Sequence, residues 1–243
     1  MLLVLDFGNT QIKAAVFENY TLLEMLRFDV AQASPSLELL LQRFPKINAV
    51  CTASVILAHE IVLQNLPDAL KKWTIQRQHK FPFVNAYRTP QTLGLDRIVL
   101  AAGAVLAYPN QNRLVIDAGT CITYDFISAQ DVYKGGAISP GINMRYKALH
   151  ENTAQLPLLT LTEDFPLTGD STESSIHSGV LQGVLFEIEG VIAQYAQENH
   201  NFSIILTGGD ANFLAAHLKN SVFANPNFLL ESLVYVYQYQ HND

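Results

Sequence analysis

The sequence predicts an α/β protein made of two similar halves on either side of a shared cleft, and an internal repeat carries most of this prediction. In the first copy, the apolar run Leu2–Leu5 leads into Asp6-Phe7-Gly8-Asn9-Thr10, and a second apolar run, Ile12–Phe17, follows. In the second copy, Leu114–Ile116 leads into Asp117-Ala118-Gly119-Thr120, and Ile122–Ile127 follows. After each copy, helical patterns alternate with short apolar runs, which is the element order of an α/β fold.

The first half is expected to contain four strands and three helices. The predicted strands are Leu2–Leu5, Ile12–Phe17, Leu22–Phe28 and Ile47–Thr52. The predicted helices are Ser36–Phe44, which Pro35 introduces, Val55–Leu66 and Leu93–Leu106. Pro82 disfavours a central strand in the segment Phe81–Tyr87. The segment Pro109-Asn110-Gln111-Asn112 is the best turn between halves, so the expected domains are residues 1–110 and 111–243.

The second half is expected to repeat this order with a longer central helix. The predicted strands are Val115–Ile116, Ile122–Ile127, Val132–Ile138 and Ser203–Leu206. One predicted helix follows Pro140-Gly141 and runs to Leu149, and others run from Ser175 to Gln197 and from Leu229 to Tyr239. The segment Phe213–Leu218 is expected to start a further helix. Residues 155–169 are expected to form a loop because they include Pro157 and Pro166.

Composition excludes several classes of function. A net charge of −7 with scattered basic residues disfavours nonspecific binding to nucleic acid or to membrane surfaces. No apolar run resembles a membrane span, and the N-terminus lacks the features of a signal peptide, so a cytoplasmic location is expected. Cys51 and Cys121 lie in apolar runs without metal-ligand spacing and are expected to be buried free thiols.

The two repeated turns have the chemistry of phosphate-binding loops. A hairpin alone needs Gly and Asn, but it does not need Asp before the turn or Lys after it. In the first copy, Gly8 permits close backbone approach to a phosphate, and Lys13 neutralises phosphate charge. Asp6 is expected to hold a hydrated magnesium ion. The residues of the first turn that are predicted to bind the phosphates of a nucleoside triphosphate such as ATP are Asp6, Phe7, Gly8, Asn9, Thr10, Gln11, Ile12 and Lys13.

Further motifs give the chain a specific family resemblance. Gly94-Leu95-Asp96-Arg97 opens a predicted helix between the two repeated turns. The motifs that follow the second turn are Gly135-Gly136-Ala137-Ile138-Ser139-Pro140-Gly141, Ser171–Gly179 and Leu206-Thr207-Gly208-Gly209-Asp210-Ala211. Each motif alone is weak, but six in this order across nearly the whole chain resemble type III pantothenate kinases. That family belongs to the superfamily of acetate kinase, sugar kinases and actin, so the resemblance implies two ribonuclease H-like domains flanking a nucleotide cleft.

The resemblance implies an activity and a role for particular residues. The activity is ATP-dependent phosphorylation of pantothenate to 4′-phosphopantothenate, the first step of coenzyme A biosynthesis, with ATP and Mg²⁺. Asp96 matches the family's general base, and Asp117 matches a ligand of a monovalent cation, K⁺ or NH₄⁺. Thr120 matches a residue that contacts ATP. The positions that match substrate-binding residues are Tyr87, Gly94, Leu95, Asp96, Arg97 and Thr172. A homodimer whose pantothenate pocket is completed by the partner subunit is also implied.

Purely structural interpretations stand beside these roles. Asp96 at a helix start also stabilises the helix dipole, Arg97 is also compatible with a surface ion pair, and Tyr87 with a half-buried loop aromatic. Ser171 or Thr172 is a candidate N-cap for the helix that follows. The glycines at 179, 183 and 190 indicate close helix packing, either within the chain or across a dimer interface.

Two rival functions remain open at this level. One is phosphoryl transfer to another acceptor, such as a sugar, acetate or polyphosphate, which the segment from Tyr87 to Arg97 disfavours. The other is a non-catalytic regulatory homologue that binds nucleotide and a partner. The presence of Asp6, Asp96, Asp117 and Thr172 together disfavours this second possibility, because a protein without catalytic activity has no chemical need for all four.

Overall fold

The computed structural model describes residues 1–8, 11–53, 57–199, 201–219 and 222–241. The chain forms two compact units, each of which is assembled from separate segments. The first unit comprises Met1–Phe83, Arg88–Ala107 and Phe228–Asp243, and the second comprises Val84–Tyr87 and Tyr108–Asn227. Compared with a single boundary at residue 110, the final helix therefore lies in the first unit, and a short segment around residue 85 lies in the second.

The first unit is built on a five-stranded sheet with the order β3-β2-β1-β4-β5. Its strands are β1 (Leu2–Phe7), β2 (Ile12–Glu18), β3 (Thr21–Phe28), β4 (Ala49–Thr52) and β5 (Lys71–Thr74). The first three strands form an antiparallel meander, and β4 and β5 are added in parallel. The hairpin of β1 and β2 forms because two apolar runs flank a short turn, and its register sets Asp6 opposite Lys13.

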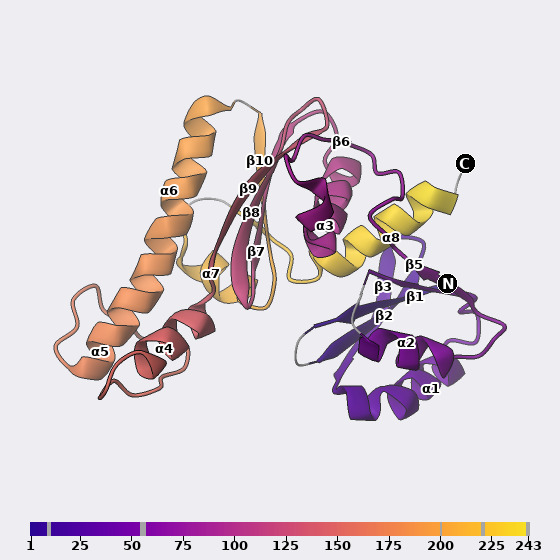
Figure 1. Ribbon diagram of the computed structural model, residues 1–243, viewed down its shortest axis with the longest axis horizontal. Coiled ribbons are helices and arrows are strands. Elements are labelled where there is room, and N and C mark those ends of the chain that lie inside the picture. Colours follow the sequence, from indigo (N-terminus) through magenta and orange to yellow (C-terminus); the bar gives the residue numbers. More distant parts are fainter. Residues whose placement is uncertain (9–10, 54–56, 200, 220–221, 242–243) are drawn as a thin grey trace. The chain divides into compact units, whose positions relative to one another are not determined.

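Helices cover both faces of this first sheet. The helices α1 (Ala33–Arg43) and α2 (Leu57–Gln64) lie on one face (Figure 1), where Leu37 and Val62 join Leu3 and Leu5 of β1 in one buried cluster. On the other face, α8 (Phe228–His241) contacts β1, β4 and α3 (Leu95–Ala107). Short 3₁₀ turns, Val30–Gln32 and Pro90–Thr92, precede α1 and α3.

The second unit is built on a six-stranded sheet with the order β11-β10-β7-β8-β9-β6. Its strands are β7 (Asn112–Ala118), β8 (Cys121–Ile127), β9 (Val132–Pro140), β10 (Phe202–Thr207) and the two-residue strands β6 (Val84–Asn85) and β11 (Phe223–Ala224). Strands β7, β8 and β9 form an antiparallel meander, and β10 pairs with β7 in parallel. The central order β9-β8-β7-β10 therefore repeats the order β3-β2-β1-β4 of the first sheet, as the duplicated sequence predicts.

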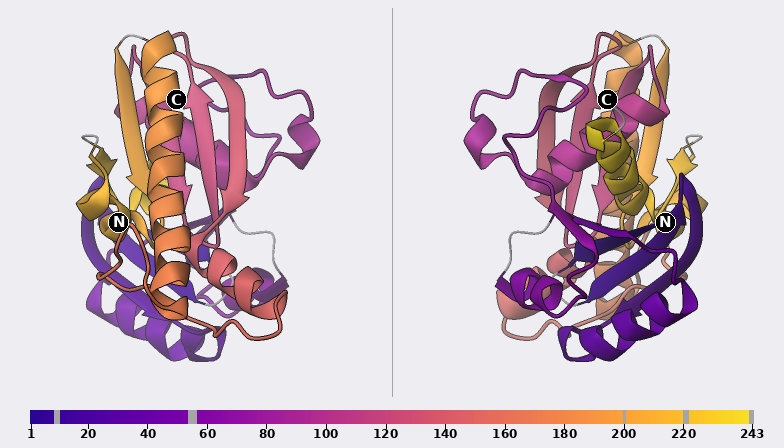
Figure 2. Two further views of the ribbon diagram at one scale, coloured as in Figure 1. Left: turned by 90° about the vertical axis from the view of Figure 1, so that its left-hand side faces the viewer. Right: turned by 90° about the vertical axis from the view of Figure 1, so that its right-hand side faces the viewer.

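One face of the second sheet is covered by α4 (Ile142–Glu151), α7 (Ala211–His217) and a long composite helix. The composite helix consists of α5 (Thr172–His177), a π-helical segment (Ser178–Gln182) and α6 (Gly183–Glu198), and it runs along the sheet (Figure 2). It spans Thr172–Glu198 and is long and apolar enough to cross a membrane, contrary to the expectation that no segment resembles a span. Its residues Val180, Val184 and Ile188 are nevertheless buried in the core of this unit, as in a core helix.

The structure contains three strands that the sequence did not predict, and it corrects the prediction for one of the two cysteines. The strands β5, β6 and β11 were not predicted, because each is short and exposes part of its side chains. The segment with Pro82 is confirmed as non-central, since β6 lies at the edge of the sheet. Cys51 is a buried free thiol as expected, whereas Cys121 is only half-buried.

Candidate active site

The first phosphate turn, residues 6–13, joins β1 to β2 in the first unit. Asp6 is the last but one residue of β1, and Lys13 lies opposite it on β2 with its Nζ 3.8 Å from Asp6 Oδ2. The Gly8 N–H donates a hydrogen bond to the Gln11 carbonyl at 3.0 Å, which closes the turn. Ile12 is buried and Phe7 half-buried, so these two residues anchor the turn to the sheet. The predicted ATP-binding residues Asn9 and Thr10 lie outside the described residues.

The electrostatics of Asp6 connect this turn to the start of α3. Burial raises the pKa of the Asp6 carboxyl, and the nearby Lys13 ammonium opposes that effect. The negative charge of Asp96 raises the pKa of Asp6 further. The two carboxylates therefore lie within electrostatic range of each other inside one unit, and they favour a bound cation or a shared positive partner.

The motif Gly94–Arg97 begins helix α3. Asp96 lies in its first turn, and its Oδ1 accepts a hydrogen bond from the Arg97 N–H at 2.9 Å. A Cβ atom at Gly94 would lie 2.3 Å from the same oxygen, so a larger residue there would displace the Asp96 side chain. Before the motif, the Arg77 guanidinium donates to the Leu93 carbonyl at 2.9 Å and fixes the approach to the helix.

The two charged residues of this motif, Asp96 and Arg97, differ in their exposure to solvent. Asp96 is exposed, as a group that meets a substrate must be, and Leu95 is buried beside it. Arg97 is only 5% exposed, so its interpretation as a surface ion-pair former is wrong. A guanidinium that is buried so deeply is desolvated and is suited to fork-shaped recognition of a carboxylate.

Tyr87 belongs to the second unit, where a short strand and a glycine hold it. The Val84 N–H donates to the Asp131 carbonyl at 2.8 Å and the Ala86 N–H to the Tyr133 carbonyl at 3.0 Å, which fixes the segment on the edge of β9. A Cβ atom at Gly135 (φ +98°) would lie 3.0 Å from the Tyr87 ring, so the ring packs directly on the backbone there. Sequence reasoning did not assign this supporting role to the Gly135-Gly136 motif.

The second phosphate turn, residues 117–120, joins β7 to β8. The Gly119 N–H donates to the Cys121 carbonyl at 2.9 Å, and Thr120 is exposed at the tip. Gly141 packs against the turn so closely that a Cβ atom on it would lie 2.1 Å from the Gly119 carbonyl oxygen. The spacing of the motif that ends in Gly141 is therefore explained by contact with the second turn.

The motif after β10 packs against Asp117. Gly208 has φ +96°, and a Cβ atom there would lie 2.5 Å from Asp117 Oδ1 and 2.3 Å from the Ala118 carbonyl oxygen. The Asp210 N–H donates to that carbonyl at 3.0 Å, and burial raises the pKa of the Asp210 carboxyl. Only glycine combines this backbone conformation with this close approach.

Thr172 lines a separate hollow of about 810 Å³ in the second unit. The N-cap of α5 is Ser171, whose hydroxyl accepts from the Ser174 N–H, and the Ser174 hydroxyl accepts from the Ser171 N–H in return. This capping box does not use the Thr172 hydroxyl, which is exposed beside Asp170 and Ile176 in the hollow. Thr172 is therefore placed for a contact outside its own helix.

The predicted site residues divide between the two units. Asp6, Lys13 and the motif Gly94–Arg97 belong to the first unit, whereas Tyr87, Asp117, Thr120 and Thr172 belong to the second. Within the described residues, no cluster of three or more His, Cys, Asp or Glu side chains is arranged to hold a metal ion. A magnesium ion at Asp6 would accordingly depend on water and phosphate oxygens for most of its ligands.

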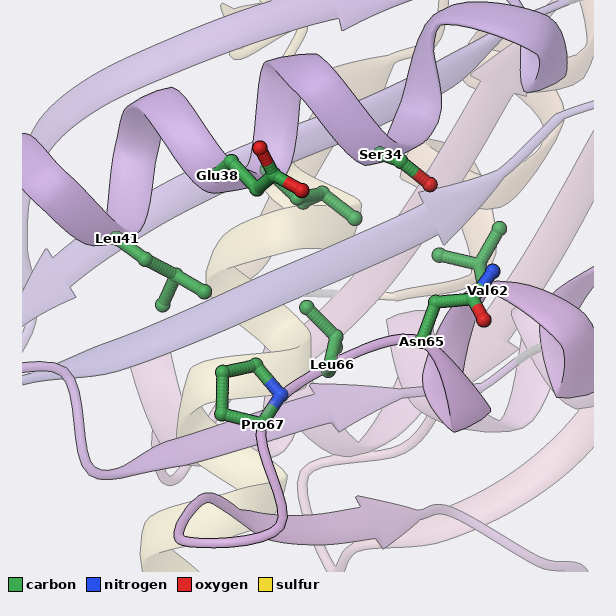
Figure 3. Close-up of a pocket in the computed structure, with 8 residues that line it drawn as sticks. Ser34, Glu38, Leu41, Val62, Asn65, Leu66 and Pro67 are labelled. Atoms are coloured by element: carbon green, nitrogen blue, oxygen red, sulfur yellow. The ribbon is translucent and has the colours of Figure 1, made fainter.

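A further hollow of about 490 Å³ lies between α1 and α2 (Figure 3). Its lining is mixed, with the apolar residues Leu37, Leu41 and Leu66 and the polar residues Glu38 and Asn65. Leu37 and Leu66 pack with Leu5 on the sheet face opposite to Asp6. This hollow therefore does not belong to the candidate active site.

The duplicated sheets and their two Asp-containing turns define a protein of the actin-like ATPase fold. Solved structures show the same architecture. A Campylobacter jejuni protein assigned to the Baf family of transcriptional activators is 21% identical, with a TM-score of 0.65 and coverage of 99% of this chain and 100% of that chain. A glucokinase from an Antarctic psychrotroph is 12% identical, with a TM-score of 0.52 and coverage of 100% and 99%.

Sequence comparisons narrow this class to one family. The family model of type III pantothenate kinase matches residues 2–194. Type III pantothenate kinase of Flavobacterium johnsoniae is 52% identical over 99% of this chain and 98% of its own length. The enzyme of Bacteroides fragilis is 37% identical over 99% of both chains. This chain belongs to the type III pantothenate kinase family.

Proposed function

We propose that this chain transfers the γ-phosphoryl group of ATP to the primary alcohol of pantothenate, and that Asp96 is the general base. The product is 4′-phosphopantothenate, and the reaction is the first step of coenzyme A biosynthesis, in the cytoplasm. Family membership supports the activity. The observation that supports the catalytic assignment is the electrostatic coupling of Asp96 to Asp6 of the first phosphate turn.

This coupling supports a role for Asp96 as the carboxylate that meets the acceptor hydroxyl close to the phosphate-binding turn. Asp96 takes the proton of the pantothenate hydroxyl while that oxygen forms a bond to the γ-phosphorus, and the bond from phosphorus to the bridging oxygen breaks to release ADP. Lys13, 3.8 Å from Asp6, neutralises phosphate charge at the same turn. Because the protein does little covalent chemistry in such reactions, holding the two substrates in line supplies much of the rate.

We assign one cation of the reaction to each of the two aspartates, Asp6 and Asp117. A kinase of this family uses ATP with Mg²⁺, and burial raises the pKa of Asp6, as expected of a carboxylate that a cation would stabilise. When bound, Mg²⁺ neutralises charge on the phosphate oxygens. We assign a monovalent cation, K⁺ or NH₄⁺, to Asp117, and contact with ATP to Thr120 at the tip of the second turn.

The proposed reaction is tested by an ADP-release assay on the purified chain with ATP, Mg²⁺ and K⁺, with and without pantothenate. Release that depends on pantothenate supports the proposal, and its loss when Na⁺ replaces K⁺ supports the monovalent cation. ADP release that does not depend on pantothenate would indicate that the phosphoryl group goes to another acceptor. No release, although ATP still binds, would favour a regulatory homologue.

We expect Arg97→Lys to raise the Michaelis constant for pantothenate about tenfold, because lysine keeps the charge but loses the bidentate geometry that suits the pantothenate carboxylate. The Michaelis constant for ATP should change little. The matched control is Arg88→Lys at an exposed arginine of the same unit, which should leave both constants unchanged. Equal increases for the two substrates would contradict a carboxylate contact.

The proposed homodimer uses the composite helix of the second unit. A Cβ atom at Gly179 or Gly190 would meet nothing within 4 Å, and Phe186 between them is 54% exposed. The interpretation of these glycines as intrachain packing residues therefore has no support at these two positions. An open small-residue surface with one large aromatic residue suits a helix from a second copy, and the hollow that Thr172 lines would be completed there.

We expect Phe186→Glu to convert a dimer of 27.0 kDa subunits into a monomer, because a charge would be buried at the centre of the proposed interface. Light scattering during size-exclusion chromatography measures the mass. Leu39→Glu, at a residue 47% exposed on α1 of the first unit, is the matched control and should not change the mass. A Phe186→Glu protein that keeps the dimer mass would exclude this face as the interface.

A further inference from the structure

Two buried hydroxyl groups in the second unit lack hydrogen-bond partners among the described residues. They are Oγ1 of Thr123 on β8 and Oγ1 of Thr207 on β10. Thr207 is only 1% exposed. An unpaired buried hydroxyl is unfavourable, because it has lost its hydrogen bonds to water without gaining others. Two such groups in one sheet therefore point to a ligand that accepts their oxygen lone pairs.

Both hydroxyls flank Asp117. Thr123 is directly opposite Asp117 in the antiparallel pair of β7 and β8. Thr207 is beside Asp117 in the parallel pair of β7 and β10. Residues paired in this way project to the same face of a sheet, with Cβ atoms about 4.5–5.5 Å apart in the antiparallel pair. The sheet therefore carries a row of oxygen groups in the order hydroxyl, carboxylate, hydroxyl.

This row lies on the sheet face opposite to the helix-covered core. Ile116, Ile122 and Leu206, which alternate with the three polar residues, all belong to the buried cluster under α4, α6 and α7. Gly208 lies at the end of the row, where a Cβ atom would lie 2.5 Å from Asp117 Oδ1. The absence of a side chain there keeps the approach to the carboxylate open.

The equivalent position in the first unit carries a different group. Asp6 is the counterpart of Asp117, and the residue opposite it is Lys13, whose ammonium lies 3.8 Å from the carboxylate. In the second unit the residue opposite the aspartate is Thr123. One copy thus supplies a positive charge from its own chain, and the other supplies a neutral oxygen at the same place.

We infer that Thr123 and Thr207 are hydroxyl ligands which, together with Asp117, hold the monovalent cation. This inference deepens the proposed function, on which it rests for the choice of cation. One carboxylate balances one positive charge, and the neutral hydroxyls add oxygen ligands without excess negative charge. The diffusible cation at Asp117 takes the place that the Lys13 ammonium occupies at Asp6.

Thallium(I), a heavy substitute for K⁺, tests the ligand assignment without measuring turnover. Thallium NMR on the full chain, with a non-hydrolysable ATP analogue, should show a bound ion that K⁺ displaces and Na⁺ does not. Thr123→Val and Thr207→Val should each weaken thallium binding about tenfold, as expected for the loss of one oxygen contact to a charged ligand. Thr21→Val on the edge strand β3 is the matched control and should bind as the unmodified chain does.

A lysine exchange tests the comparison between the two copies. Thr123→Lys should abolish thallium binding and should make the thermal unfolding temperature independent of K⁺. The inference is overturned if both valine variants bind thallium at full strength, in which case water occupies the site. The ADP-release assay separates this failure from failure of the proposed function, because that assay is made on the unmodified chain and its result does not depend on the valine variants.

Discussion

Asp96→Asn is expected to lower kcat for pantothenate phosphorylation by about 10²–10⁴-fold, the usual contribution of a general base. Asparagine keeps the Oδ1 atom that accepts the Arg97 N–H at 2.9 Å, so the start of α3 should be preserved. The substitution removes the negative charge of the carboxylate and, with it, the ability to take a proton. Circular dichroism and the thermal unfolding temperature should therefore match those of the unmodified chain.

A second measurement, the pKa of Asp6, reports the loss of the negative charge of Asp96. Because Asp96 raises the pKa of Asp6, the Asp96→Asn variant should show a lower Asp6 pKa by carbon NMR. The matched control is Asp68→Asn, at a fully exposed aspartate of the same unit, which should leave kcat and the Asp6 pKa unchanged. A folded Asp96→Asn enzyme with near-normal kcat would assign the base to another group.

Much of the candidate site could be predicted because it follows from local pattern. Apolar runs on either side of a Gly-containing turn determine hairpins, so the positions of Asp6 and Asp117 at strand ends could be inferred before their strands were known to pair. The amphipathic pattern of Leu93–Leu106 likewise predicted α3 to within two residues and placed Asp96 in its first turn.

Features that depend on long-range pairing could not be predicted in this way. The pattern of Leu229–Tyr239 indicates a helix, but it does not say that the helix packs with α3 in the first unit. In the sequence alone, Thr123 and Thr207 cannot be distinguished from other strand residues. Only the register of β7 with β8 and β10 shows that they lie beside Asp117. Strand β5 was not predicted, because two of its four residues, Lys71 and Lys72, are exposed and it therefore has no continuous apolar pattern.

The packing of α8 on α3 leads to the largest expected effect on stability. Helix α3 carries Asp96 and Arg97 at its start, and Gly103 lies two turns further on against Ser232 of α8. A Cβ atom at Gly103 would lie 2.0 Å from Ser232 Oγ, 2.5 Å from its Cβ and 2.9 Å from its Cα. The close approach of the two helices therefore requires glycine at this position.

We expect Gly103→Ala to lower the free energy of unfolding by about 1–3 kcal/mol, because overpacking outweighs the gain of up to about 1 kcal/mol in helix propensity. Calorimetry should show a fall of about 2–4 °C in the unfolding temperature per kcal/mol lost. Adding Ser232→Gly should recover part of the loss, since it removes the two closest atoms, whereas adding Ser232→Ala should recover less because Cβ remains. If Gly103→Ala stabilises the chain, α3 and α8 cannot be in contact at this point, and the helix that presents Asp96 must be supported in another way.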